Sequence, residues 1–130
     1  MARAYSFRGR SVEELQKLSM ADFSKLLKAR QRRSIKRMGA KYKALVKKAE
    51  KIRNDGGKKA LKTHTREALI LPQWIGMHFG VFNGKEFKDL LITQEMIGHR
   101  LGEFVFTTKR VLHSAPGIRA TRGSKFLAVK

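Results

Sequence analysis

The sequence predicts an α+β fold in which basic helices precede a small antiparallel sheet with short helices, and a basic extended tail follows it. Three observations support this prediction. Apolar residues recur at helical spacing before residue 55, they alternate or form short runs between residues 68 and 92, and neither period continues in the tail. With 130 residues, 42% of them hydrophobic, the chain is long enough for one core.

Two start signals predict helices in the N-terminal segment. The first is a capping box formed by Ser11 and Glu14, after which apolar residues follow at helical spacing. The second is Ser19 with Asp22, which begins a longer helix through "MADFSKLLKARQRRSIKRM". Gly39 is expected to end or kink that helix.

A further helix is predicted over "AKYKALVKKAEKIRN", and Asp55-Gly56-Gly57 stops it. One face of this helix is apolar and consists of Tyr42, Leu45, Val46, Ala49 and Ile52. The apolar stripes of the N-terminal helices are narrow, so these helices need another surface to pack against.

The central segment changes to a strand period. "ALIL" (68–71) predicts a short strand closed by Pro72, and the helical turn after it places Trp74 and Ile75 in the core. In "MHFGVF" the apolar residues alternate, which predicts a strand with one buried face. That face consists of Met77, Phe79 and Val81.

Asn83-Gly84 predicts a hairpin with a two-residue type I′ turn, because that turn needs positive φ at both central residues. "KEFKDLLI" returns as the second strand, in a register that places Phe87 opposite Gly80. Thr93 is expected to cap one more helical turn, which ends at Gly98. "HRLGEF" then forms an exposed corner.

The formal net charge of +20 is unevenly distributed. Residues 1–62 carry +15, residues 63–103 carry −1 and residues 104–130 carry +6. This distribution predicts a basic helical N-terminal extension (1–62), a compact α+β core (63–113) and a flexible basic tail (114–130) that orders on a partner. Such a surplus repels itself unless a polyanion relieves it, so nucleic acid is the first candidate partner and an anionic membrane surface the second.

The densest run extends from Lys25 to Lys48, with 11 Lys and Arg and no acidic residue. A charge run can be a solvated helix face, but such faces mix both signs to form i,i+4 pairs. Here like charges stand at that spacing, as at Arg33 and Arg37, so phosphate contact is the favoured interpretation. The residues expected to make this contact are Arg30, Arg32, Arg33, Lys36 and Arg37.

Other classes of function are disfavoured. The chain has no cysteine, which excludes disulfides and cysteine-based zinc or nucleophile sites. It has no run of about 18 apolar residues and no secretory signal, so we expect a soluble intracellular protein. None of the histidines has metal-ligand spacing, and no metal site is assigned; these residues are His64, His78, His99 and His113.

His99 and Glu103, in "IGHRLGEF", raise the question of an acid–base pair. We expect Gly102 and the corner to keep them off a common helix face, so no catalytic residue is assigned. The ordinary alternative for a lone histidine is a structural role, but His99 beside Arg100 is better placed to donate to phosphate or stack on a base. "GGKKA" (56–60) lacks the spacing of a P-loop.

"KTHTR" (62–66) is either an ordinary polar linker or a continuation of the positive surface, and its place after the basic helices favours the second. The phenylalanines of the central segment are expected in the core, so we expect recognition by nucleic-acid backbone and shape rather than by base stacking. These residues are Phe79, Phe82, Phe87, Phe104 and Phe106.

Several segments together resemble a known family. "KTHTR" followed by "ILP", "VFNGK", "MIGHRLGEF" and a Thr-Lys-Arg-x-x-x-His run resemble the small-subunit ribosomal protein S-nineteen family over about residues 58–113. The N-terminal "YSFRG" and "ARQRRSIKR", with the tail "HSAPGIRATRGSKFLAVK", resemble the longer archaeal and eukaryotic branch. His64, Glu67 and Trp74 depart from the family pattern.

The resemblance implies a non-enzymatic protein without a cofactor that binds small-subunit rRNA in the head of the subunit. It also implies a place next to ribosomal protein S-thirteen and near the aminoacyl-tRNA site, so tRNA in that site is a further expected partner. The rRNA contacts that it implies at matching positions are Lys62, Thr63, Arg66, Lys85, His99, Arg100, Lys109, Arg110 and His113. The tail adds Arg119, Arg122 and Lys125 to the candidate set.

Two other classes stay open at this point. An architectural DNA-binding protein of the nucleoid usually dimerises, and no long dimer seam is evident. A basic membrane-surface helix needs a broad aromatic face, whereas residues 20–53 contain only Phe23 and Tyr42 as aromatics.

Overall fold

The computed structural model describes residues 5–56 and 59–109, and its α+β class agrees with the prediction. The predicted tail lies outside the described residues. The helices are α1 (Val12–Lys17), α2 (Met20–Leu26), α3 (Ala29–Arg37) and α4 (Gly39–Asn54). The strands are β1 (Ser6–Phe7), β2 (Arg10–Ser11), β3 (Leu61–Thr63), β4 (His78–Phe82) and β5 (Phe87–Leu91). The described residues also form 3-10 helices at Pro72–Trp74, Gln94–Met96 and Leu101–Glu103.

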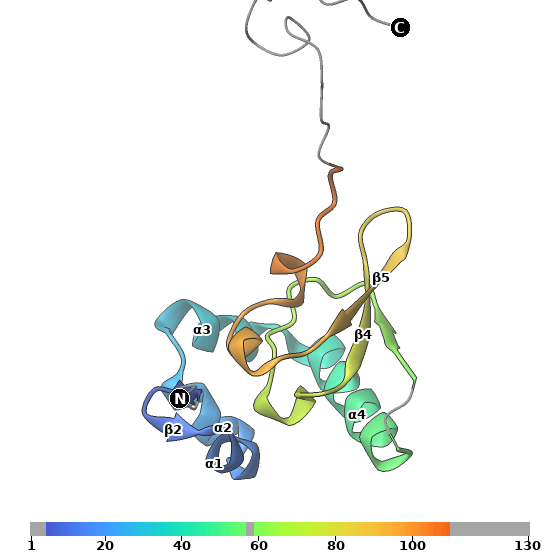
Figure 1. Ribbon diagram of the computed structural model, residues 1–130. Coiled ribbons are helices and arrows are strands. Elements are labelled where there is room, and N and C mark those ends of the chain that lie inside the picture. The colour runs from blue at the N-terminus through green and yellow to red at the C-terminus, as the bar shows by residue number, and fades with distance from the viewer. Residues whose placement is uncertain (1–4, 57–58, 110–130) are drawn as a thin grey trace, which may run out of the picture.

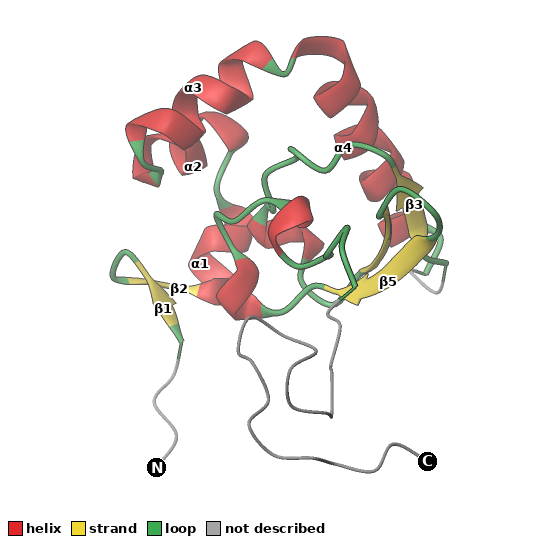
Figure 2. Cartoon of the chain, turned by 90° about the horizontal axis from the view of Figure 1, so that it is seen from above, coloured by secondary structure: helices red, strands yellow, loops and turns green. Residues whose placement is uncertain are grey.

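The first two helices and the sheet occupy different sides of the molecule. In Figure 1, α1 and α2 lie at one end, and the hairpin of β4 and β5 lies at the other. In Figure 2, α4 leads from α3 to the sheet, where it packs against β3. The long basic helix therefore connects the two sides.

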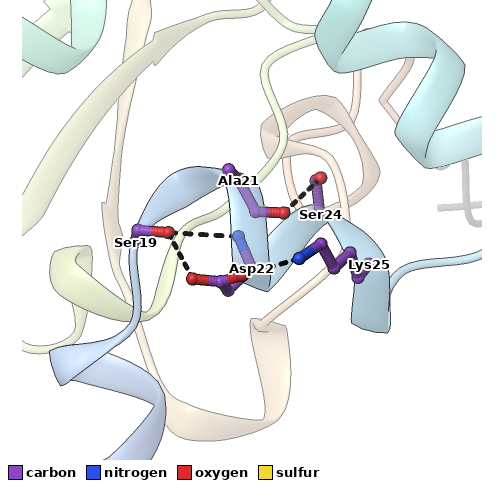
Figure 3. Close-up of polar contacts among 5 residues, drawn as sticks. All are labelled: Ser19, Ala21, Asp22, Ser24 and Lys25. Carbon is purple, nitrogen blue, oxygen red and sulfur yellow. Dashed lines mark hydrogen bonds and ion pairs between the residues drawn. The ribbon is translucent and has the colours of Figure 1, made fainter.

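Both predicted helix starts are confirmed. In α1, Ser11 Oγ accepts a hydrogen bond from Glu14 N at 3.4 Å, and Glu14 Oε2 accepts from Ser11 N at 3.3 Å. In α2, Ser19 Oγ accepts from Asp22 N at 3.2 Å and donates to Asp22 Oδ2 at 2.7 Å (Figure 3). Lys25 Nζ lies 2.9 Å from the other oxygen of this carboxylate. Hydrogen bonds from Lys25 and Ser19 hold the pKa of Asp22 below its ordinary value.

The single helix predicted after Ser19 is wrong, because the chain breaks at Leu27 and Lys28 and continues as two helices. Leu27 has an extended backbone and is buried, so the break directs its side chain into the core. Lys28 N donates to Gln31 Oε1 at 3.2 Å at the start of α3. Gly39, with a φ of 54°, forms the expected kink between α3 and α4.

The apolar face predicted for α4 packs against the core. Its buried residues are Tyr42, Leu45 and Ala49, with Val46 and Ile52 partly buried beside them. The Tyr42 hydroxyl donates to Leu69 O at 3.1 Å, and burial raises the pKa of Tyr42 well above its ordinary value. The helix ends at Asn54, as predicted, and Gly56 follows with positive φ.

The sheet of β3, β4 and β5 is mixed rather than purely antiparallel. The strand β3 runs parallel to β4, with Leu61 paired with Phe79, whereas β4 and β5 form the predicted antiparallel hairpin. The strand β3 was not predicted, because a parallel partner lies far along the chain and leaves no local turn signal. The buried face of β4 is the one predicted by the alternation, with Phe79 and Val81 buried and Met77 buried just before it.

The predicted hairpin register is wrong by two residues on β5. Phe82 pairs with Phe87, which leaves a four-residue loop, and Gly80 pairs with Asp89 instead of Phe87. Phe87 is nonetheless near Gly80, because a Cβ on Gly80 would lie 3.7 Å from the Cβ of Phe87. The two residues are diagonal neighbours on one face of the sheet.

The side chain of Asn83 explains the longer loop. Its Oδ1 accepts from Lys85 N and Glu86 N, both at 2.9 Å, which closes the turn without a left-handed backbone at Asn83. Within the Asn-Gly pair, positive φ is confined to Gly84. The two-residue loop with positive φ at both positions lies instead at Arg8-Gly9, between β1 and β2.

The apolar run "ALIL" is extended and buried, but it does not join the sheet as the predicted strand. It pairs with residues 98–102, at the start of the corner, where Ile70 N donates to His99 O at 2.8 Å and Leu101 N donates to Ala68 O at 3.0 Å. The pairing is short because a 3-10 helix follows on each side. Leu101 is fully buried, so the corner is exposed only in part.

One hydrophobic core joins the helices to the sheet. Leu15 of α1 and Phe23 of α2 belong to the same buried cluster as Trp74 and Phe79. The predicted core position of Trp74 is thus confirmed, and Ile75 is partly buried against the same cluster. The packing crosses the charge-based boundary at residue 62, because the N-terminal helices supply part of the core.

Candidate nucleic-acid interface

Arginines of α3 and of the corner surround one hollow. On α3, Arg30, Arg33 and Arg37 recur at spacings of three and four residues, which places them on one face. The corner adds Arg100, which is half-buried. We name this hollow, of about 460 Å³, the arginine pocket, and its lining residues are Arg30, Arg33, Ser34, Arg37, Met38, Glu67 and Arg100.

α3 has no fully buried residue, and polar contacts with the corner add to the packing of its partly buried Ile35 against the core. Gln31 Nε2 donates to Gly98 O, while its Oε1 accepts from Lys28 N. Arg100 Nη2 donates to Ser34 Oγ at 3.0 Å. The sequence analysis did not identify Gln31, although a glutamine at the third position of a helix is a recognised capping residue.

A second hollow, of about 670 Å³, lies between α4 and residues 62–66. We name it the lysine groove, and its lining residues are Lys41, Ala44, Leu45, Lys48, Lys62, Thr63, His64, Thr65, Arg66 and Glu67. Lys41 and Lys48 were not among the predicted contacts, but their seven-residue spacing places them on one helix face and could have identified them. Glu67 lines both hollows, so the groove adjoins the arginine pocket.

The cations of these two hollows form no ion pair with a carboxylate of the described residues. The ion pairs within residues 5–56 and 59–109 are Lys25–Asp22, His78–Asp89, Lys88–Glu86 and His99–Glu103. Glu67 is the acidic residue in the two linings. The positive charges that crowd along residues 25–48 therefore repel one another, as the sequence predicted. A polyanion would relieve that repulsion.

Two of the predicted contact residues are engaged within the protein. Thr63 is only 7% exposed, and its Oγ1 accepts from Thr65 N at 3.0 Å. Arg66 donates to three backbone carbonyls, those of Phe82 at 2.8 Å, Gly102 at 3.1 Å and Val105. A Cβ on Gly102 would lie 3.0 Å from Arg66 O, which explains the glycine at this close approach. We therefore assign both Thr63 and Arg66 structural roles.

His99 and Glu103 do meet, and the expectation that the corner separates them is wrong. The 3-10 turn brings Glu103 Oε2 to 2.7 Å from His99 Nδ1, and Glu103 Oε1 accepts from Arg100 N at 3.2 Å. Because a carboxylate only accepts, Nδ1 carries the hydrogen and Nε2 is left for a ligand. Both side chains are about half exposed, so the contact orients the imidazole at the surface.

Lys85 and Lys109 both line a third hollow, of about 770 Å³, between the hairpin loop and the segment after the corner. Its lining also contains Glu86 and Asp89, so its net charge is less positive than that of the lysine groove. The structure thus does not bring Lys85 and Lys109 together with the arginines of α3.

The remaining predicted residues fall into two groups. Arg32 Nη2 donates to Leu27 O at 3.2 Å, and Lys36 is exposed on α3 outside the lining of the arginine pocket. The others lie outside the described residues, and they are Arg110, His113, Arg119, Arg122 and Lys125.

The expected burial of five phenylalanines is correct for Phe79 alone. Phe104 is partly buried against the core, Phe106 is 79% exposed and Phe87 is 36% exposed. Phe82 is partly exposed and faces away from the core. The alternation along β4 and β5 explains this result, because Phe82 and Phe87 pair on the outer face of the sheet.

Two further features bear on the class of site. In residues 5–56 and 59–109, His, Asp and Glu do not gather in groups of three that could hold a metal ion. None of the helices described is both long enough and apolar enough to cross a bilayer.

Comparison with known proteins shows the family of this chain. The family model described as ribosomal protein S19 matches residues 33–113, which include α4, the lysine groove and the corner. The small ribosomal subunit protein uS19 of Saccharolobus solfataricus is 48% identical over 128 residues, covering 97% of this chain and 91% of that protein. The protein of the same name from Metallosphaera sedula is 45% identical over 130 residues, covering 98% of this chain and 93% of its own length. The chain therefore belongs to the ribosomal protein S19 family.

Proposed function

We propose that this protein is a structural constituent of the small ribosomal subunit that binds small-subunit rRNA through the arginine pocket and the lysine groove. The family is one of structural ribosomal proteins, so the chain is a protein of the cytoplasmic ribosome and not an enzyme. The names of the relatives support the choice of subunit. The hollows supply the chemistry, because guanidinium and ammonium groups recognise phosphate.

The observation that carries this proposal is the convergence, from separate parts of the chain, of cations that form no ion pair within residues 5–56 and 59–109. α3 supplies three arginines, the corner supplies Arg100, and α4 and β3 supply the lysines of the adjoining groove. Adjacent hollows of this charge suit a sugar–phosphate backbone that passes from one to the other. With Nδ1 donating to Glu103, Nε2 of His99 at the edge of the corner is an acceptor, which suits a ribose 2′-hydroxyl.

The test measures binding of small-subunit rRNA at several salt concentrations. Log K falls as log salt rises. In the variant Arg30→Gln/Arg33→Gln/Arg37→Gln, we expect the magnitude of this slope to decrease by roughly 2 to 3, because three phosphate contacts are lost. Glutamine keeps a similar helix propensity. The variant should remain folded.

The control removes the same charge elsewhere. Lys17→Gln/Lys51→Gln/Arg53→Gln changes three exposed cations that line neither hollow. Its salt slope should stay close to that of the unaltered protein. Equal losses in the two triple variants would contradict the proposed site, and a preference for duplex DNA over rRNA at matched salt would favour an architectural DNA-binding protein.

We also propose, from the family resemblance, that the protein lies in the head of the subunit, next to ribosomal protein S-thirteen and near the aminoacyl-tRNA site. Chemical cross-linking of purified small subunits tests this position. Cross-links to ribosomal protein S-thirteen are expected, and their absence alongside abundant links to proteins outside the head would contradict the proposal.

A further inference from the structure

Three rings form a cluster on the outer face of the sheet. The centroid of His64 lies 4.6 Å from that of Phe82 and 5.1 Å from that of Phe87, and the two phenylalanine rings are 5.2 Å apart. His64 and Phe87 are exposed, and Phe82 is partly exposed. We name these three residues the aromatic platform.

The platform adjoins the lysine groove. Lys62 and His64 line the groove, and Lys62 Nζ lies 5.5 Å from the centroid of the Phe87 ring. Gly80 makes room for this contact, because a Cβ there would lie 3.2 Å from Lys62 Cγ. One lysine therefore belongs to both the cationic groove and the aromatic surface.

The protein holds the platform in place before any ligand binds. Phe82 and Phe87 are a directly opposed pair of β4 and β5, and the guanidinium of Arg66 donates to Phe82 O at 2.8 Å. A carboxylate also lies on this face of β5, that of Asp89. It is engaged by His78, whose Nδ1 lies 2.9 Å from it. Exposed rings fixed in this way, beside unpaired lysines, are the combination that binds unpaired nucleotides, since bases stack on aromatic faces and lysines contact the phosphates.

We infer that the aromatic platform and the lysine groove together bind an unpaired segment of RNA, with a base stacked on the platform and its phosphates in the groove. The inference rests on the proposed rRNA binding and deepens it. It replaces recognition of backbone and shape alone, which the sequence favoured, with a site that requires single-stranded nucleotides. Lys41 and Lys48 contact the phosphates on the α4 side, and Lys62 contacts them beside the base.

The test compares a short unstructured RNA that carries a fluorescent aminopurine base with an RNA duplex. Phe82→Leu/Phe87→Leu keeps apolar side chains on the sheet but removes the flat rings. We expect about tenfold weaker binding of the single strand, an unchanged salt slope, and binding of the duplex altered less than about twofold. Quenching of the aminopurine should be strong with the unaltered protein and weak with this variant.

The matched control is Leu91→Ala, which shortens a 47% exposed apolar side chain on the same face of β5. It should bind the single strand like the unaltered protein. Lys41→Gln/Lys48→Gln should lower the salt slope while keeping the quenching of bound aminopurine. Circular dichroism confirms that each variant is folded before binding is compared.

Single-strand affinity and quenching in Phe82→Leu/Phe87→Leu equal to those of the unaltered protein would overturn the inference. Equal losses in Leu91→Ala would also overturn it, because the face would then act as a general apolar surface, such as one that docks a protein. Failure of the proposed function is distinguishable from both results, because the unaltered protein would then not bind rRNA at all.

Discussion

The arginine pocket and the lysine groove adjoin, but their walls are held in different ways. The groove is built on α4, whose Tyr42, Leu45 and Ala49 are buried in the core. The pocket is built on α3, which has no fully buried residue and is held by polar contacts of Gln31 and Ser34 and by the partly buried Ile35. Like-charge repulsion therefore acts on a well-anchored helix in one case and on a weakly anchored helix in the other. We conclude that the groove is preformed, whereas the order of α3 depends more strongly on neutralisation by phosphate.

The largest effect is expected from Trp74→Ala, which removes the apolar anchor of the groove. Trp74 is 2% exposed, and its ring packs against those of Tyr42 and Phe79. We expect a loss of about 3–5 kcal/mol in the free energy of unfolding, from lost burial and the cavity left behind. Urea denaturation followed by circular dichroism measures it. A loss below about 1 kcal/mol would show that the core does not hold α4 as described.

A smaller and local effect is expected from Gln31→Ala, which removes both polar contacts that the Gln31 side chain makes at the first turn of α3. The loss should be about 1–2 kcal/mol and confined to α3. Hydrogen exchange should accelerate for amides of α3 and stay unchanged in β4. Gln94→Ala, at an exposed glutamine, is the control. Uniform acceleration throughout the protein would mean that α3 unfolds only with the core.

The smallest effect near neutral pH is expected from Tyr42→Phe, which removes the hydrogen bond to Leu69 O and should cost about 1 kcal/mol. Burial raises the pKa of Tyr42 from its ordinary value of 10.0. The stability contributed by the neutral phenol is therefore fully present below pH 10.0 and is lost as pH rises above it. Urea titrations at increasing pH should show the unaltered protein losing stability faster than the variant. Parallel loss in both proteins would contradict the burial of this hydroxyl.

Local signals predicted much of the fold. The capping box at Ser11, the kink at Gly39, the buried face of α4 and the alternation along β4 depend on neighbours within a few residues, and all are confirmed. The break at Leu27 follows mainly from the packing of that side chain in the core, and Gln31, at the third position of α3, is its local sign. The parallel strand β3 likewise depends on a partner far along the chain.

The candidate site was predicted in composition more than in geometry. The charge run identified the arginines of α3, but it gave no sign that Arg100 of the corner would join them. Arg66 had the residue type of a phosphate ligand, yet its donors bind backbone carbonyls that only the fold brings near. Phe82 and Phe87 had the residue type of a core, yet the alternation along β4 and β5 places both rings on the outer face of the sheet.

The most direct test of the central claim, that rRNA lies across the two cationic hollows, is ultraviolet cross-linking of intact small subunits with identification of the RNA-linked peptides. Cross-links are expected in residues 28–48 and 59–66, which contribute α3, the basic face of α4 and the edge of the groove. Cross-links found elsewhere in the chain, with none in these two segments, would contradict the account.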